Sequence, residues 1–189
     1  MTRRLVLAVV AATAALTVNG LAQAPGDRLV VILGGRTIGH LRATPDGNRV
    51  VVDYDYKNNG RGPTLAENIT LTQKGLPSSW TITGSTTFGN KIDERFGQSA
   101  GRAEWRDASG DGSVASDGEA VYVPQTASPW SLGLYARLLN RTVNKRMPAL
   151  PSGTLTLTKG ADLTMSGGGG TVRVTAYTLG GTNLTPDYV

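Results

Sequence analysis

Apolar and polar residues alternate along much of the chain, and the clearest stretch covers residues 49–63. Val50, Val52, Tyr54 and Tyr56 fall on one side of an extended chain, whereas Val51, Asp53, Asp55 and Lys57 fall on the other. A period of two places alternate side chains on opposite faces of a sheet, so the pattern predicts a half-buried β-strand. Asn59-Gly60, Gly62 and Pro63 end it, because glycine accepts positive φ and proline cannot donate to a sheet ladder. Leu65, Glu67, Ile69 and Leu71 then alternate in the same way, which predicts a second strand returning beside the first.

Similar short runs predict further strands before and after this hairpin. They lie near residues 29–33, 36–42, 80–88, 92–96, 103–105 and 120–123, and again around Leu155, Leu163 and Val172. Asp46-Gly47 predicts a tight hairpin, and residues 107–112 have the composition of a turn or loop. Four glycines at residues 167–170 predict the connection between the last two strands.

One helix is predicted, from Ser128 as N-cap and Pro129 as first helical residue to about Arg141. Trp130, Leu134 and Leu138 recur at helical spacing, and Pro148 follows the helix. Strands and helices do not alternate. The sequence therefore predicts a mainly β protein: a curved or two-layer antiparallel sheet of about ten strands with one α-helix packed on it.

The first residues have the pattern of a secretory signal. Arg3 and Arg4 precede an apolar run over residues 5–18, and Ala22-Gln23-Ala24 offers a small-x-small cleavage site. We predict a signal peptide over residues 1–24, a single β-rich domain over residues 25–189, no membrane span after signal removal, and a periplasmic or secreted location. Without the signal, 17 Lys+Arg face 14 Asp+Glu, and this net charge of +3 does not favour nucleic acid as a partner.

Three charged residues are candidates for a structural pair. Glu67 and Glu94 lie on the apolar sides of their strands, where an unpaired charge is costly. Arg61 lies between two glycines in the predicted turn. One hypothesis is that Arg61 is paired with Glu67 or Glu94; the alternative is a long turn with solvated charges.

The sequence does not show a catalytic set. The string at residues 97–101 matches G-x-S-x-G, but a predicted strand follows it and the one histidine, His40, lies upstream. A catalytic zinc site needs about three protein ligands, usually including histidines, and the chain has no cysteine. Asp107, Ser109 and Asp111 begin like a calcium loop, but its twelfth position is Gly118, so a structural turn is favoured.

Several motifs, taken in order and spacing, resemble the N-terminal region of secreted bacterial amidohydrolase family proteins. They are residues 53–63 (DYDYKNNGRGP), 75–77 (GLP), 87–89 (TFG), 93–96 (DERF), 103–105 (AEW), 136–139 (ARLL) and 150–153 (LPSG). The resemblance covers about residues 28–189 and implies a β-rich domain that precedes a catalytic barrel. Zinc or another divalent metal is implied only for that barrel, because none of the family's metal ligands is present here. Residues 184–189 resemble the link into the barrel, so we expect the chain to be a fragment whose partner is a barrel domain in the same or a longer chain.

Two alternatives remain open at the level of the sequence. A free-standing periplasmic binding module would enclose an apolar ligand, with Tyr54, Trp80, Trp105 and Trp130 lining its cavity. The other alternative is a purely structural envelope protein. The three tryptophans are more typical of a core than of a binding platform.

Overall fold

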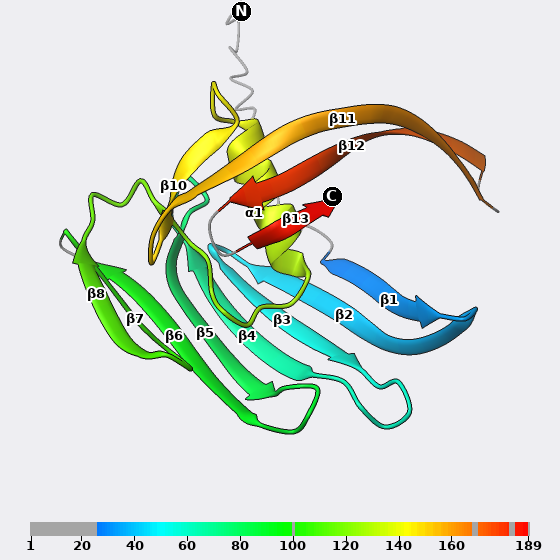
Figure 1. Ribbon diagram of the computed structural model, residues 1–189, viewed down its shortest axis with the longest axis horizontal. Coiled ribbons are helices and arrows are strands. Elements are labelled where there is room, and N and C mark those ends of the chain that lie inside the picture. The colour runs from blue at the N-terminus through cyan, green and yellow to red at the C-terminus, as the bar shows by residue number, and fades with distance from the viewer. Residues whose placement is uncertain (1–25, 100, 168–169, 182–183, 189) are drawn as a thin grey trace, which may run out of the picture.

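The computed structural model describes residues 26–99, 101–167, 170–181 and 184–188. The predicted signal peptide therefore lies outside the described residues. Their fold is the predicted one, mainly β with a single helix, and it contains two sheets (Figure 1).

The larger sheet is an eight-stranded antiparallel meander. Each strand pairs with its neighbours in the sequence, in the order β1-β2-β3-β4-β5-β6-β7-β8. The strands are β1 (Asp27–Leu33), β2 (Arg36–Asp46), β3 (Arg49–Tyr56), β4 (Thr64–Leu71), β5 (Pro77–Ser85), β6 (Lys91–Ser99), β7 (Arg102–Asp107) and β8 (Gly110–Ala115). The tight hairpin predicted at Asp46-Gly47 is confirmed, because Asp46 is paired with Arg49 and Gly47 has a φ of 59°.

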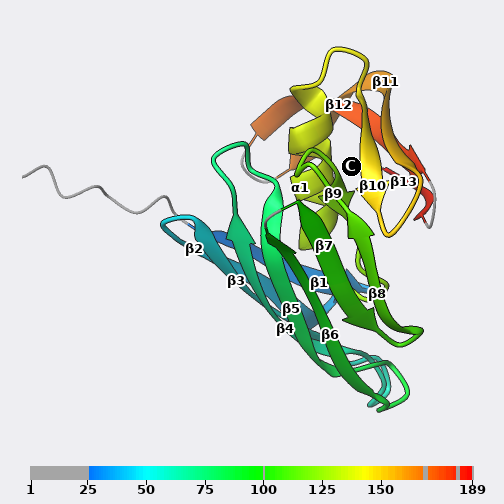
Figure 2. The same ribbon diagram turned by 90° about the vertical axis from the view of Figure 1, so that its left-hand side faces the viewer.

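The second sheet has the order β13-β12-β11-β10-β9. Its strands are β9 (Val121–Tyr122), β10 (Arg146–Leu150), β11 (Thr154–Gly167), β12 (Gly170–Gly181) and β13 (Leu184–Tyr188). Strands β9 and β10 are parallel, and the other pairs are antiparallel. Helix α1 (Trp130–Asn140) lies between the two sheets (Figures 1 and 2).

One hydrophobic core joins the helix to both sheets. The alternation predicted for β3 is confirmed, because Val50, Val52 and Tyr54 face the core and Val51 and Asp53 are exposed. The helix buries the side chains that recur at helical spacing, which are Trp130, Leu134, Tyr135, Leu138 and Leu139. The second sheet contributes Leu155, Leu157 and Leu179.

Three strands, β8, β10 and β13, were not predicted, and each contains glycine or proline, which are uncommon within strands. Strand β8 contains two glycines and lies where a turn or loop was expected; it exists because its backbone is bonded to β7. Strand β10 contains Pro148, which cannot donate a hydrogen bond. Pro148 is tolerated because β9 pairs only with Ala149 and Leu150, beyond the proline.

Two other boundaries differ from the prediction. The strands expected around Leu155 and Leu163 are one strand, β11, with an irregular pairing between Lys159 and Asp162 in place of a turn. The helix begins at Trp130, one residue later than expected, and Pro129 occupies the cap position without a side-chain cap.

Candidate functional site

The β3–β4 turn contains a second, smaller hairpin. The Asn58 amide donates to the Arg61 carbonyl at 2.7 Å, and the Arg61 amide donates to the Asn58 carbonyl at 3.0 Å. Between them, Asn59 and Gly60 both have positive φ, 51° and 77°, as a two-residue type I′ turn requires. Arg61 is therefore held by backbone hydrogen bonds on both sides of a tight turn.

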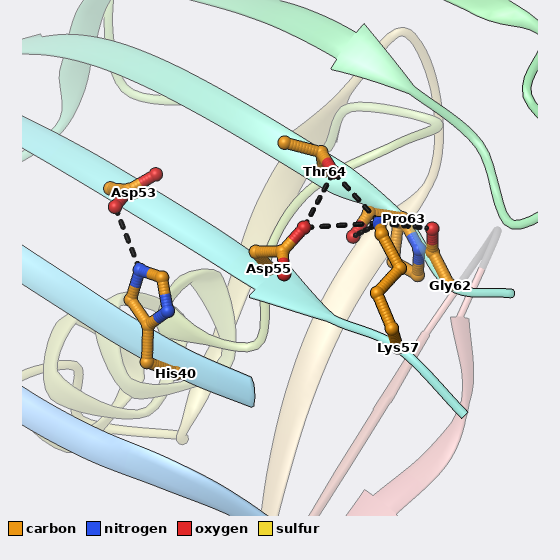
Figure 3. Close-up of polar contacts among 7 residues, drawn as sticks. All are labelled: His40, Asp53, Asp55, Lys57, Gly62, Pro63 and Thr64. Carbon is orange, nitrogen blue, oxygen red and sulfur yellow. Dashed lines mark hydrogen bonds and ion pairs between the residues drawn. The ribbon is translucent and has the colours of Figure 1, made fainter. Parts of the chain in front are cut away.

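The Lys57 ammonium closes the base of this turn (Figure 3). It donates to the Gly62 carbonyl at 2.7 Å, to the Pro63 carbonyl at 3.2 Å and to Thr64 Oγ1 at 2.8 Å. Its nitrogen also lies 3.0 Å from Asp55 Oδ2. A lysine that bridges two carbonyls and a carboxylate fixes the path of the chain from β3 to β4.

Asp55 completes the cluster from β3. Its Oδ2 accepts a hydrogen bond of 2.6 Å from the Thr64 hydroxyl, and this bond, with the ion pair to Lys57, lowers the pKa of Asp55. The Thr64 hydroxyl is thus engaged as donor and as acceptor. The polar groups of the cluster are used to hold the turn, which argues against Thr64 as an activated nucleophile.

His40 and Asp53 form a separate pair on neighbouring strands of the outer face of the sheet (Figure 3). His40 Nε2 lies 2.8 Å from Asp53 Oδ2, and both side chains are about half exposed. Within the described part of the chain, no hydroxyl is hydrogen-bonded to His40. The pair is therefore a cross-strand contact rather than part of a nucleophile–base arrangement.

The side chain of Arg61 lies between two surface grooves. One groove, of about 520 Å³, is lined by the β3–β4 turn and Thr87, and the other, of about 490 Å³, continues along the β5–β6 turn to Phe88. Arg61 is exposed and forms no ion pair with another described residue. Phe88 is 80% exposed.

The β1–β2 turn lies at the same end of the meander, because every second turn of an antiparallel sheet does. There Ile32 is 62% exposed and Leu33 is 51% exposed. We call this end of the sheet the turn face and define it by Ile32, Leu33, Arg61 and Phe88. It combines exposed apolar side chains with an arginine whose backbone is held in a tight turn.

The structure does not bring Arg61 to either predicted carboxylate. Glu67 is fully buried; its Oε2 accepts from Trp80 Nε1 at 3.0 Å, and its Oε1 accepts from the Ser128 amide at 2.5 Å. Burial raises the pKa of Glu67, and the bonds from Ser128 and Trp80 oppose that shift. The buried position was predicted correctly, but the partners are an indole and a backbone amide.

Glu94 is used in the same way. Its Oε1 accepts from the Tyr122 hydroxyl at 2.9 Å and from the Gln125 amide at 2.8 Å, and its Oε2 accepts from the Thr126 amide at 3.0 Å. Burial raises the pKa of Glu94, partly offset by these bonds. The two carboxylates therefore hold residues 125–128, the segment that leads into α1, against the sheet.

The four aromatic side chains proposed to line a cavity are mainly part of the core. Trp80 is completely buried, and Tyr54 and Trp130 are 9% exposed in the same cluster. Trp105 packs against that cluster and covers the backbone of Gly112. Their placement is that of structural core residues, and it gives the ligand-cavity alternative no support.

Sequence reasoning singled out Arg61 but missed the side chains that hold its turn, and it assigned no role to Phe88. Lys57 was placed only as a polar strand position within the 53–63 motif, Phe88 only as a strand end within the 87–89 motif, and Thr64 was not singled out. The signal that was available is the sequence Asn59-Gly60, since this dipeptide is typical of a type I′ turn.

The residues that were set aside as calcium ligands lie in the β7–β8 hairpin: Asp107 ends β7, Ser109 is in the turn, and Asp111 is in β8. Asp107 accepts a hydrogen bond of 2.7 Å from the Ser109 amide, and Asp111 is paired with Arg106. Among the described residues, no group of three or more His, Asp or Glu side chains is placed to hold a metal ion. Within the same residues, no helix has the length and apolar character needed to cross a membrane.

Comparisons of the chain with protein-family models, with curated proteins and with solved structures found no match.

Proposed function

We propose that this chain is a non-catalytic accessory domain that docks on the catalytic barrel of an exported, metal-dependent amidohydrolase. The single observation that carries the docking role is the turn face. Phe88, Leu33 and Ile32 are more than half exposed in turns at that end of the sheet, and hydrogen bonds hold the backbone of Arg61 in the β3–β4 turn. Exposed apolar side chains that gather at one end of a domain are typical of an interaction site, and aromatic residues and arginine are enriched among the residues that dominate binding.

The identity of the partner rests on the sequence resemblance. The motifs that resemble the N-terminal region of secreted amidohydrolases include residues 53–63, 87–89 and 93–96, and two of them form the β3–β4 and β5–β6 turns of the turn face. In this proposal, the barrel supplies the divalent metal and the C–N bond hydrolysis. The accessory domain supplies a stable sheet whose end is shaped for the barrel.

The experiment uses an amidohydrolase barrel taken from the genome of origin. We expect the purified β-rich domain to bind that barrel by isothermal titration calorimetry and, with zinc added, to hydrolyse no amide substrate by itself. Phe88→Ser and Leu33→Ser should each weaken binding about tenfold or more, as loss of a central apolar contact does. Val143→Ser is the matched control, because Val143 is 97% exposed in the loop after α1 and should leave binding unchanged.

Three results would overturn the proposal. One is the absence of any amidohydrolase barrel in the genome of origin. Another is equal binding by wild type and both turn-face variants. The third is amide hydrolysis by the isolated domain.

A further inference from the structure

A groove lies on the outer face of the large sheet, over β5–β8. It has a volume of about 790 Å³, and a smaller groove of about 380 Å³ adjoins it at Gly97, Arg102 and Glu104. The outer face is the one opposite the helix, since Arg95 and Glu104 alternate with the buried side chains of Glu94, Phe96 and Ala103. The turn face is at the end of the strands, so this groove is a separate surface.

One row of paired residues, which includes the small residues Gly97 and Ser113, crosses the floor of the groove. Across the sheet, Ser79 is paired with Gly97, Gly97 with Glu104, and Glu104 with Ser113. A side chain at Gly97 would meet no atom within 4 Å, so the position opens directly into the groove. The neighbouring row carries longer side chains, including Arg95 and Arg106, and these form one wall.

The charges in the groove do not balance. Arg102 is paired with Glu104 at 2.8 Å and also donates to the Ser113 hydroxyl at 2.6 Å. Arg106 donates twice to Asp111, at 2.5 and 2.8 Å. The carboxylates of Glu104 and Asp111 thus form ion pairs with two of the three arginines in the groove.

Arg95 is the third arginine, and no hydrogen bond or ion pair joins its guanidinium to another described residue. It lies close enough to Asp111 to contribute to the lowered pKa of that carboxyl, but the hydrogen bond from Arg106 is the main cause. A guanidinium presents a planar fork of donors that matches the oxygens of a carboxylate or a phosphate. The N–H groups of the Arg95 guanidinium therefore have no partner among the described residues, and they lie next to the open space at Gly97.

We propose that this groove binds the oxyanion of a ligand, with Arg95 as the principal donor and Gly97 leaving the space for it. The chemistry required of the ligand is a carboxylate or phosphate group whose oxygens accept two parallel hydrogen bonds. Ser113, whose hydroxyl accepts a hydrogen bond from Arg102, lines the same space. This site is independent of the turn face and of the proposed docking partner.

The test is an NMR titration of the isotope-labelled domain with inorganic phosphate and, separately, with succinate, at constant ionic strength. We expect saturable shifts of the Gly97 and Ser113 amides with at least one of the two anions, and the anion that binds identifies the ligand class. Arg95→Gln should weaken that binding about tenfold or more, because a hydrogen bond to a charged group is lost. Arg36→Gln, at the first residue of β2, is the matched control and should bind as the wild type does.

A second variant tests whether binding needs the empty space at Gly97, rather than the charge of Arg95. Gly97→Leu keeps every arginine and fills the floor of the groove, so it should also abolish the saturable shifts while the protein still unfolds cooperatively. Shifts that do not saturate with either anion would overturn the proposal. Equal affinities in wild type and Arg95→Gln would overturn it as well.

Discussion

Replacing Glu67 by leucine tests whether the buried carboxylates hold the segment that leads into α1. Leucine occupies a similar volume but accepts no hydrogen bond, so it deprives both the Trp80 indole N–H and the Ser128 amide of their acceptor. Trp80 and Ser128 are 0% and 1% exposed, so water does not replace the lost partner.

The expected magnitude follows from these two donors. A buried donor without a partner costs about 1–3 kcal/mol, so two of them cost about 2–6 kcal/mol. Removing a desolvated carboxylate acts in the opposite direction, and we therefore expect the lower part of this range, about 2–4 kcal/mol of lost stability. For a domain of this size, that is a fall in melting temperature of about 2–4 °C for each kcal/mol.

Urea unfolding, followed by tryptophan fluorescence and circular dichroism, measures the free energy of unfolding. Glu104→Leu is the control, because the Glu104 side chain is 65% exposed in an ion pair, and its loss should change stability by less than about 1 kcal/mol. In a Trp80→Phe background, which already lacks the indole donor, Glu67→Leu should be less destabilising by about 1–3 kcal/mol. If Glu67→Leu unfolds within about 0.5 kcal/mol of the wild type, the carboxylate does not hold this segment.

The remaining predictions concern packing, the β3–β4 turn and pH. Gly112→Ala should destabilise the domain by about 1–3 kcal/mol because the new methyl group meets the Trp105 ring, whereas Gly97→Ala should be nearly neutral; equal unfolding midpoints would contradict this. Lys57→Met should speed proteolytic cleavage within residues 57–63, measured by mass spectrometry, because the ammonium no longer bridges two carbonyls; an unchanged cleavage pattern would show that the backbone holds the turn alone. Burial raises the pKa of Glu94 above 4.5, so wild-type stability should fall as pH rises through that raised pKa, and Glu94→Gln should show a smaller fall; parallel pH profiles would refute this.

Much of the large sheet could be predicted because its evidence is local. The side chains of β3 alternate with a period of two, so Val50, Val52 and Tyr54 had to share one face wherever the strand was placed. The spacing of Trp130, Leu134 and Leu138 likewise identified the buried side of the helix. Strands β8 and β10 lack such a pattern, and they exist because a neighbouring strand offers hydrogen bonds at the right distance.

The candidate sites depended on contacts that the sequence does not contain. It determined that Glu67 and Glu94 face the core, that the residues after β3 form a turn, and that Arg61 lies in it. Only the tertiary structure decided which groups those charges meet, because Ser128 is 61 residues from Glu67 and Thr126 is 32 residues from Glu94 along the chain. The physical reason is that alternation fixes the face of a side chain, whereas its partner is set by the packing of segments far apart in the sequence.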